Sequence, residues 1–136
     1  MKAETELSSE LAKRLTNDLT GSVVFKISDH FTPGVPDLAV NWIHTTWLEV
    51  KATADGKIRW HRSWGKQLLT ARRLERATLR CWFIIYEQVR DTKRTVIARP
   101  RDVQQDLTYV PLEEAPGHDH TFIRDFIIRL EREVPL

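Results

Sequence analysis

One segment limits the fold more than any other. Residues 81–87 read Cys-Trp-Phe-Ile-Ile-Tyr-Glu, an almost continuous apolar run. Such a run is typical of a strand that is buried on both faces of a sheet. The segment before it, residues 62–79, contains no proline and is predicted to be an amphipathic helix. The sequence therefore predicts an α/β fold in which helices pack against a mixed sheet.

The other elements follow from the spacing of apolar residues. Leucines at every fourth position predict a helix over residues 4–18, and a second apolar face predicts a final helix over residues 121–133. The strands are predicted at residues 22–27, 37–41, 47–52, 81–87 and 95–98, with a short helix at 100–106 and a loop at 113–120. The predicted order is helix, three strands, helix, one or two strands and C-terminal helices.

Length and composition exclude several classes of protein. The 136 residues are predicted to form a single domain, residues 1–136, and a hydrophobic fraction of 41% excludes a disordered chain. No apolar stretch is long enough to span a membrane, and the polar N-terminus does not resemble a signal peptide. The single cysteine, Cys81, excludes an internal disulfide and a Cys-x-x-Cys zinc site. We therefore expect a soluble, cytoplasmic protein.

The formal net charge of +2 conceals a strong asymmetry. Residues 57–101 hold 13 basic and three acidic residues, a net of +10, whereas the rest of the chain has a net of −8. Basic side chains form one stripe on the helix predicted at 62–79, and such a stripe suits a polyanion such as the DNA backbone. The alternative is a solvated helix face. The stripe consists of Arg62, Lys66, Arg73, Arg76 and Arg80.

Three charged residues form the candidate site. Alternation along the strand at 47–52 sends Glu49 and Lys51 to one face, and Asp37 begins the strand expected to pair with it. If Asp37 lies on the same face, the two carboxylates can hold one Mg²⁺ between them, beside the Lys51 ammonium. The alternative is a turn residue next to a surface ion pair. Charged groups between core positions need partners, which favours the functional interpretation.

These residues resemble a known family. Residues 34–38 (Gly-Val-Pro-Asp-Leu), residues 47–51 (Trp-Leu-Glu-Val-Lys) and Gln67 are similar to the PD-(D/E)xK nuclease superfamily. Within it, they resemble the small VRR-NUC type and the archaeal Holliday-junction-resolvase-like members of phages and mobile elements. The resemblance covers residues 4–87 and implies a restriction-endonuclease-like core of helix, three-stranded meander, crossover helix and further strand. Residues 100–136 form a C-terminal extension outside it.

The resemblance also implies roles for individual residues. Asp37 and Glu49 would bind a catalytic Mg²⁺, for which Mn²⁺ can substitute, and the backbone carbonyl of Val50 would be a further ligand. Lys51 would act on the nucleophilic water. Gln67 matches a glutamine that often follows this strand in the family. Its place on the apolar face of its helix agrees with a role near Lys51, because a buried amide needs a hydrogen-bond partner.

Further candidates lie around this core. Members of the family use an acid on the first helix, and here the candidates are Glu6 and Glu10, of which we favour Glu10 because it lies beside the buried leucines. Lys26 precedes the Pro-Asp loop and is expected to touch the scissile phosphate, although an exposed strand end explains it equally well. Trp60 is expected to stack on a splayed base.

The expected function is that of a Mg²⁺-dependent nuclease that hydrolyses DNA phosphodiester bonds. Junctions, flaps or other branched DNA are the expected substrates, in repair or recombination, and the resemblance implies a homodimer. Two alternatives remain open at this point. One is a DNA-binding or regulatory protein on a nuclease-like scaffold that does not cleave. The other is a nuclease subunit that requires a partner protein.

Overall fold

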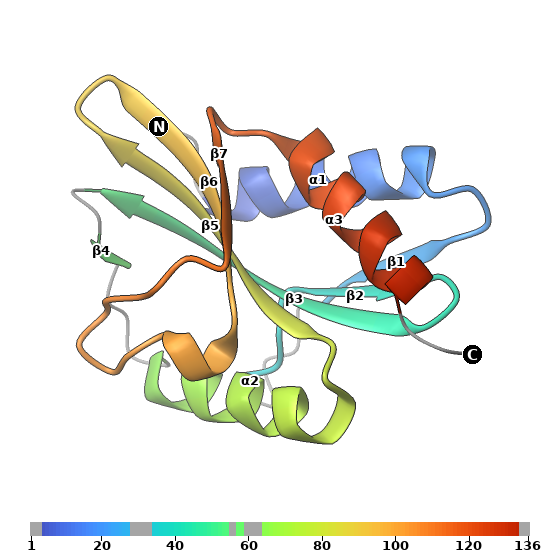
Figure 1. The fold of residues 1–136 in the computed structure, drawn as a ribbon, viewed down its shortest axis with the longest axis horizontal. Coiled ribbons are helices and arrows are strands. Elements are labelled where there is room, and N and C mark those ends of the chain that lie inside the picture. The colour runs from blue at the N-terminus through green and yellow to red at the C-terminus, as the bar shows by residue number, and fades with distance from the viewer. Residues whose placement is uncertain (1–3, 28–33, 55–56, 59–63, 134–136) are drawn as a thin grey trace.

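The computed structural model describes residues 4–27, 34–54, 57–58 and 64–133, and it is an α/β protein (Figure 1). Six strands form a mixed sheet in the order β1-β2-β3-β5-β6-β7, and the short strand β4 pairs with β3. β3 and β5 are parallel, and the other pairs are antiparallel. The strands are β1 (Val23–Lys26), β2 (Leu38–Asn41), β3 (Thr45–Ala54), β4 (Lys57–Ile58), β5 (Cys81–Val89), β6 (Thr92–Ala98) and β7 (Glu113–Pro116).

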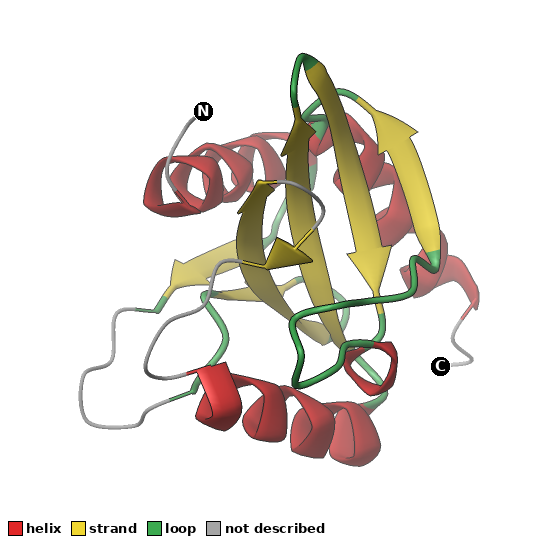
Figure 2. Ribbon diagram, turned by 90° about the vertical axis from the view of Figure 1, so that its left-hand side faces the viewer, coloured by secondary structure: helices red, strands yellow, loops and turns green. Residues whose placement is uncertain are grey.

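Helices cover both faces of the sheet. Helices α1 (Glu4–Asp18) and α3 (His120–Glu133) lie on one face, and α2 (Trp64–Thr78) lies on the other with the short 3₁₀ helix η1 (Pro100–Asp102) (Figures 1 and 2). The parallel pair β3–β5 requires a crossover, which α2 supplies. Among the described residues, no helix is long and apolar enough to cross a bilayer.

The predicted strand at 81–87 is confirmed as the centre of the core. The first seven residues of β5 are buried, as expected for a strand covered on both faces. Ile84 and Tyr86 pack toward α1 and α3, whereas Phe83 and Ile85 pack toward α2. The helix predicted at residues 4–18 is also confirmed, because its leucines form the buried stripe of α1.

The C-terminal region differs from the sequence prediction. The predicted loop at 113–120 contains β7, which pairs with β6 and leaves alternate side chains exposed. Its sequence, Glu-Glu-Ala-Pro, has no β-branched or aromatic residue, so the strand depends on pairing with β6 rather than on its own propensity. The helix predicted at 100–106 is a single 3₁₀ turn.

The outer edge of β3 has a gap in its pairing. β2 pairs with residues 45–48 and β4 pairs with residues 53–54. Within the described part of the chain, residues 49–52 therefore have no strand beside them on this edge, although β5 pairs with them on the other. The middle of β3 is thus open to side chains that come from outside the sheet.

Gly34 fixes the approach to this gap. Its φ is +92°, and a Cβ at this position would lie 2.6 Å from the backbone oxygen of Lys66 in α2. Glycine is therefore required both for the backbone angle and for the close contact. The contact holds the segment just before Asp37 against the first turn of α2.

Candidate functional site

Glu49 and Lys51 lie on the face of β3 that α2 covers. Each is 1% exposed, and on β5 they lie beside Phe83 and Ile85, which belong to the core under α2. The alternation expected from the sequence therefore places both charged side chains on one face. They are not a surface ion pair, because both are buried.

Asp37 reaches β3 through the gap. Its Oδ2 accepts a hydrogen bond of 2.9 Å from the backbone N–H of Val50. The N–H and C=O of one strand residue point to the same edge, so the carbonyl of Val50 also points into the gap. The side chain of Asp37 thus takes the place of a neighbouring strand and lies next to Glu49.

The ammonium of Lys51 has polar partners on helices α1 and α2 and on strand β3. Its Nζ donates a 2.6 Å hydrogen bond to Oε1 of Gln67 on α2. Nζ also lies 3.9 Å from Oε1 of Glu49 and 3.7 Å from Oε1 of Glu4, which begins α1. The ring of Trp64 lies 5.7 Å from the ammonium on a further side. The charge is therefore held in one position.

Glu49 is the least satisfied group in this cluster. Among the described residues, neither of its carboxylate oxygens has a hydrogen-bond donor. Burial raises the pKa of Glu49 well above its ordinary value. The charge of Asp37, a hydrogen bond that the two carboxyls share when one is protonated, and the charge of Glu4 also raise this pKa, whereas the charge of Lys51 lowers it. A cation bound at these oxygens would offset the free-energy cost of keeping the ionised carboxylate buried.

The residues present fit a magnesium ion. No group of three or more His, Cys, Asp or Glu side chains among the described residues is placed to hold a metal. Mg²⁺, however, commonly binds to one or two carboxylates and keeps several waters. Asp37 and Glu49 supply the two carboxylates, and the carbonyl of Val50 points to the same opening. The donor set is all oxygen, as Mg²⁺ and Mn²⁺ prefer.

Glu49→Gln is expected to stabilise the metal-free protein at pH 8. Folding raises the pKa of Glu49, so its charged form is less favourable in the folded state. The resulting loss of stability grows as the pH rises from the ordinary carboxyl pKa to the folded pKa, and it disappears as the pH falls back through that window. Glutamine cannot ionise, so the substitution removes this loss of stability and should raise the Tm by about 3–10 °C at pH 8. The difference from wild type should shrink as the pH is lowered.

Thermal unfolding in EDTA, at pH 8 and at a series of lower pH values, measures the difference in Tm between Glu49→Gln and wild type. The matched control is Glu6→Gln, because Glu6 is exposed on α1 and should leave the Tm nearly unchanged. A lower Tm for Glu49→Gln than for wild type at pH 8 would contradict the prediction.

The structure brings a different acid of the first helix to the site. Glu10 lies beside His120, with 3.3 Å between its Oε2 and Nε2 of the imidazole, and Glu6 is exposed. Glu4 is the α1 acid that approaches Lys51. It lies six residues before Glu10, which is about 9 Å along a helix. The acid that contacts Lys51 thus lies in the first turn of α1. Helical periodicity shows which face of a helix is buried, but it does not show which turn of the helix lies beside a given strand.

Arg80 does not belong to the exposed basic stripe. Helix α2 ends at Thr78, and Leu79 has a φ of 59°, so the helical wheel no longer applies at Arg80. Arg80 is 7% exposed and pairs through Nη2 with Glu131 on α3. Its side chain therefore crosses to the opposite face of the sheet and serves the packing of α3.

The remaining candidates for DNA binding are placed as follows. Lys66, Arg73 and Arg76 are exposed along α2. Lys26 is exposed on β1, and its Nζ donates to Oγ of Ser9 at 2.6 Å. Arg62 and Trp60 lie outside the described residues. Of the predicted stripe, the described residues that are exposed are therefore Lys66, Arg73 and Arg76.

The side chains that meet at the middle of β3 come from separate segments of the chain. They are Glu4 of α1, Asp37 before β2, Glu49 and Lys51 of β3, and Gln67 of α2. No family model matches the chain, and a search of curated proteins finds no similar one. The site is thus characterised by its chemistry: a buried ammonium held beside the buried carboxylate of Glu49 and the half-buried Asp37, at an opening in a sheet.

Proposed function

We propose that the chain is a divalent-metal-dependent nuclease that hydrolyses DNA phosphodiester bonds. The observation that carries the proposal is the buried carboxylate of Glu49, which has no donor among the described residues and lies between Asp37 and Lys51. A carboxylate pair that can hold a metal, next to a fixed ammonium, provides what phosphodiester hydrolysis requires.

The residues divide this chemistry among them. When bound, Mg²⁺ or Mn²⁺ would polarise the scissile phosphate and lower the pKa of a bound water. Asp37 and Glu49 would hold the ion, with the carbonyl of Val50 as a further ligand. The Lys51 ammonium orients the attacking water and stabilises the negative charge that develops on the phosphate.

Gln67 and Glu4 act as positioning residues in this proposal. The amide oxygen of Gln67 accepts the hydrogen bond that fixes Nζ of Lys51, so the ammonium does not need to reorganise during the reaction. Glu4 lies on the opposite helix and partly balances the charge of Lys51. Neither residue needs to touch the metal for this role.

The arrangement of elements supports the same proposal. Helix α1, the antiparallel strands β1 to β3, the crossover helix α2 and the parallel strand β5 follow in the order expected of a restriction-endonuclease-like core. The exposed cations of α2 support DNA as the partner, because sequence-independent contacts to phosphates need such a row. The resemblance also implies a homodimer, which light scattering after size-exclusion chromatography measures directly.

A panel of end-labelled DNAs tests the proposed function. Four-way junction, flap, single-stranded and duplex substrates are incubated with the protein in Mg²⁺, Mn²⁺ or EDTA. We expect cleavage of at least one substrate with either metal and none in EDTA. Asp37→Asn should lose cleavage, whereas Asp125→Asn, an exposed aspartate on α3, should keep it.

Two results would contradict the proposal. One is cleavage that persists in EDTA, and the other is full activity of Asp37→Asn. DNA binding without cleavage under all conditions would instead favour the protein that binds DNA on a nuclease-like scaffold. Cleavage that appears only after a cell extract is added would indicate a subunit that needs a partner.

A further inference from the structure

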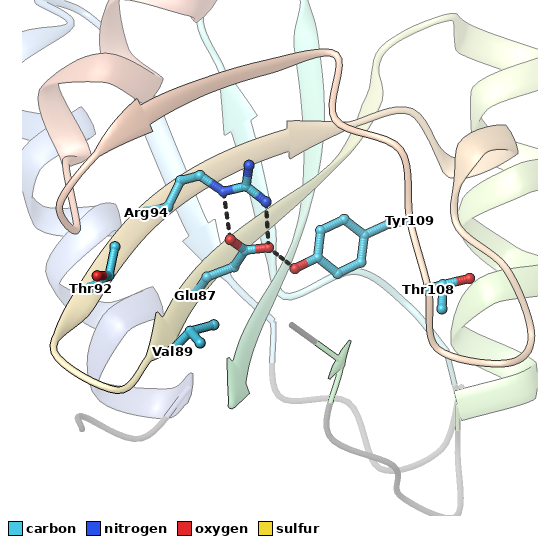
Figure 3. Close-up of a pocket in the computed structure, with 6 residues that line it drawn as sticks. All are labelled: Glu87, Val89, Thr92, Arg94, Thr108 and Tyr109. Atoms are coloured by element: carbon cyan, nitrogen blue, oxygen red, sulfur yellow. Dashed lines mark hydrogen bonds and ion pairs between the residues drawn. The ribbon is translucent and has the colours of Figure 1, made fainter. Parts of the chain in front are cut away.

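A pocket lies on the same face of the sheet as Lys51. Thr53 is two residues after Lys51 on β3, and it lies beside Glu87 of β5. From the strand rise and spacing, the Cα atoms of Lys51 and Glu87 are about 8 Å apart. The pocket has a volume of about 570 Å³ and is lined by Glu87, Val89, Thr92, Arg94, Thr108 and Tyr109 (Figure 3).

The carboxylate, the guanidinium and the phenol in this pocket are paired with one another. Figure 3 shows the guanidinium of Arg94 and the phenol of Tyr109 converging on the carboxylate of Glu87. Nε and Nη2 of Arg94 donate to Glu87 at 2.5 and 2.9 Å, and the Tyr109 hydroxyl donates to Oε2. Burial opposes the charge of Glu87, yet these hydrogen bonds hold its pKa below the ordinary value. The Glu87–Arg94 pair is therefore neutral as a unit and does not attract a phosphate.

The rest of the lining suits a flat, uncharged ligand. Val89 contributes apolar surface, Tyr109 adds an aromatic ring, and Thr92 and Thr108 complete the lining with uncharged side chains. The volume lies within the usual range for small-molecule sites. Aromatic side chains at the edge of a nucleic-acid site commonly stack on unpaired bases.

We propose that this pocket binds one unpaired nucleobase of the DNA strand whose phosphodiester lies at Glu49 and Lys51. The inference rests on the proposed nuclease function and narrows its substrate to DNA with an unpaired nucleotide close to the cut. Because the carboxylate and guanidinium are already bonded to each other, the base is held mainly by stacking and apolar contact. Recognition is therefore tolerant of base identity.

Fluorescence anisotropy in EDTA tests the pocket without cleavage. Two duplexes are compared, one with a single bulged thymine and one with an abasic site at the same bulge. Wild type should bind the bulged thymine about tenfold more tightly, as one stacked base would give. Replacing the thymine by adenine should change the affinity by less than about threefold, because stacking is tolerant of the base.

Variants test whether the preference for the bulged thymine over the abasic site comes from this pocket. Tyr109→Ala removes the ring and Val89→Trp fills the pocket, so both should reduce the ratio between the two DNAs to about one. Val110→Ala and Val110→Trp are the matched controls, since Val110 is 62% exposed and outside the lining, and they should keep the wild-type ratio. Circular dichroism checks the fold, and Val89→Trp decides the result if Tyr109→Ala is unfolded, because Val89 is partly exposed.

The outcomes separate this inference from the nuclease proposal. Three results would contradict the proposal that the pocket binds a base. They are equal affinity of wild type for both DNAs, an unchanged ratio in Val89→Trp, and no measurable binding to either DNA. If wild type cleaves DNA in Mg²⁺ and any of these results is also found, the nuclease proposal is supported and the base-binding proposal is contradicted. A base preference that Val89→Trp abolishes supports the pocket, even if no DNA is cleaved in Mg²⁺.

Discussion

Lys51→Met is expected to lower the rate of Mg²⁺-dependent DNA cleavage by about a thousandfold. The side chain is 1% exposed, and Gln67 fixes its ammonium beside the carboxylate of Glu49. Methionine keeps most of the volume and removes only the charge and the hydrogen bond. The loss should therefore appear in the chemical step, where a fixed positive charge stabilises the developing negative charge.

Single-turnover cleavage with excess folded protein measures this effect apart from DNA affinity. Lys13→Met is the matched control, because Lys13 is exposed on α1 and takes no part in the proposed site. Anisotropy in Ca²⁺ should show that Lys51→Met binds DNA within about threefold of wild type, since its contribution is made mainly in the transition state. A cleavage rate within tenfold of wild type would exclude the assigned role of Lys51.

Glu131→Ala is expected to destabilise the protein by about 3–5 kcal/mol, because it leaves the buried Arg80 without its counter-charge. Nη2 of Arg80 pairs with Glu131, while Nε and Nη1 have no hydrogen-bond partner among the described residues. Nδ1 of His44 also lies 2.8 Å from Oε2 of Glu131. One carboxylate on α3 thus connects the turn after α2 with the turn between β2 and β3.

Urea unfolding measures this loss, and thermal unfolding should show a Tm lower by about 10–20 °C. Asp125→Ala is the control on the same helix. Its side chain is 56% exposed and pairs with Arg124, so its removal should cost less than about 1 kcal/mol. Equal effects of the two substitutions would show that the buried pair does not hold α3 in place.

Local patterns in the sequence predicted the centre of the candidate site. Alternation along β3 is a property of any strand, so Glu49 and Lys51 had to share a face. Asp37 follows from the short connection between β2 and β3, which makes the two strands neighbours. Gln67 followed from the resemblance and from its place on the inner face of α2. These four residues depend on contacts within neighbouring elements, which periodicity describes well.

The positions that were mispredicted depend on how distant elements pack. Glu4 and Glu10 are both on α1, and only the docking of the helix decides which acid reaches Lys51. Arg80 continues the charge pattern of α2 in sequence, but the chain leaves the helix at Leu79 and turns to α3. The pocket at Glu87 was also missed, since its lining comes from the β5–β6 hairpin and the segment after η1.

The gap in the pairing of β3 also bears on self-association. Unpaired backbone groups at a sheet edge can recruit a strand from another molecule and begin aggregation. Here the opening is bounded by β2 and β4 and spans residues 49–52, and the carboxylate of Asp37 already occupies the N–H of Val50. A foreign strand has too few free groups to pair with, whereas an ion or a phosphate group needs only one or two. The same opening can thus admit small charged ligands and reject other chains.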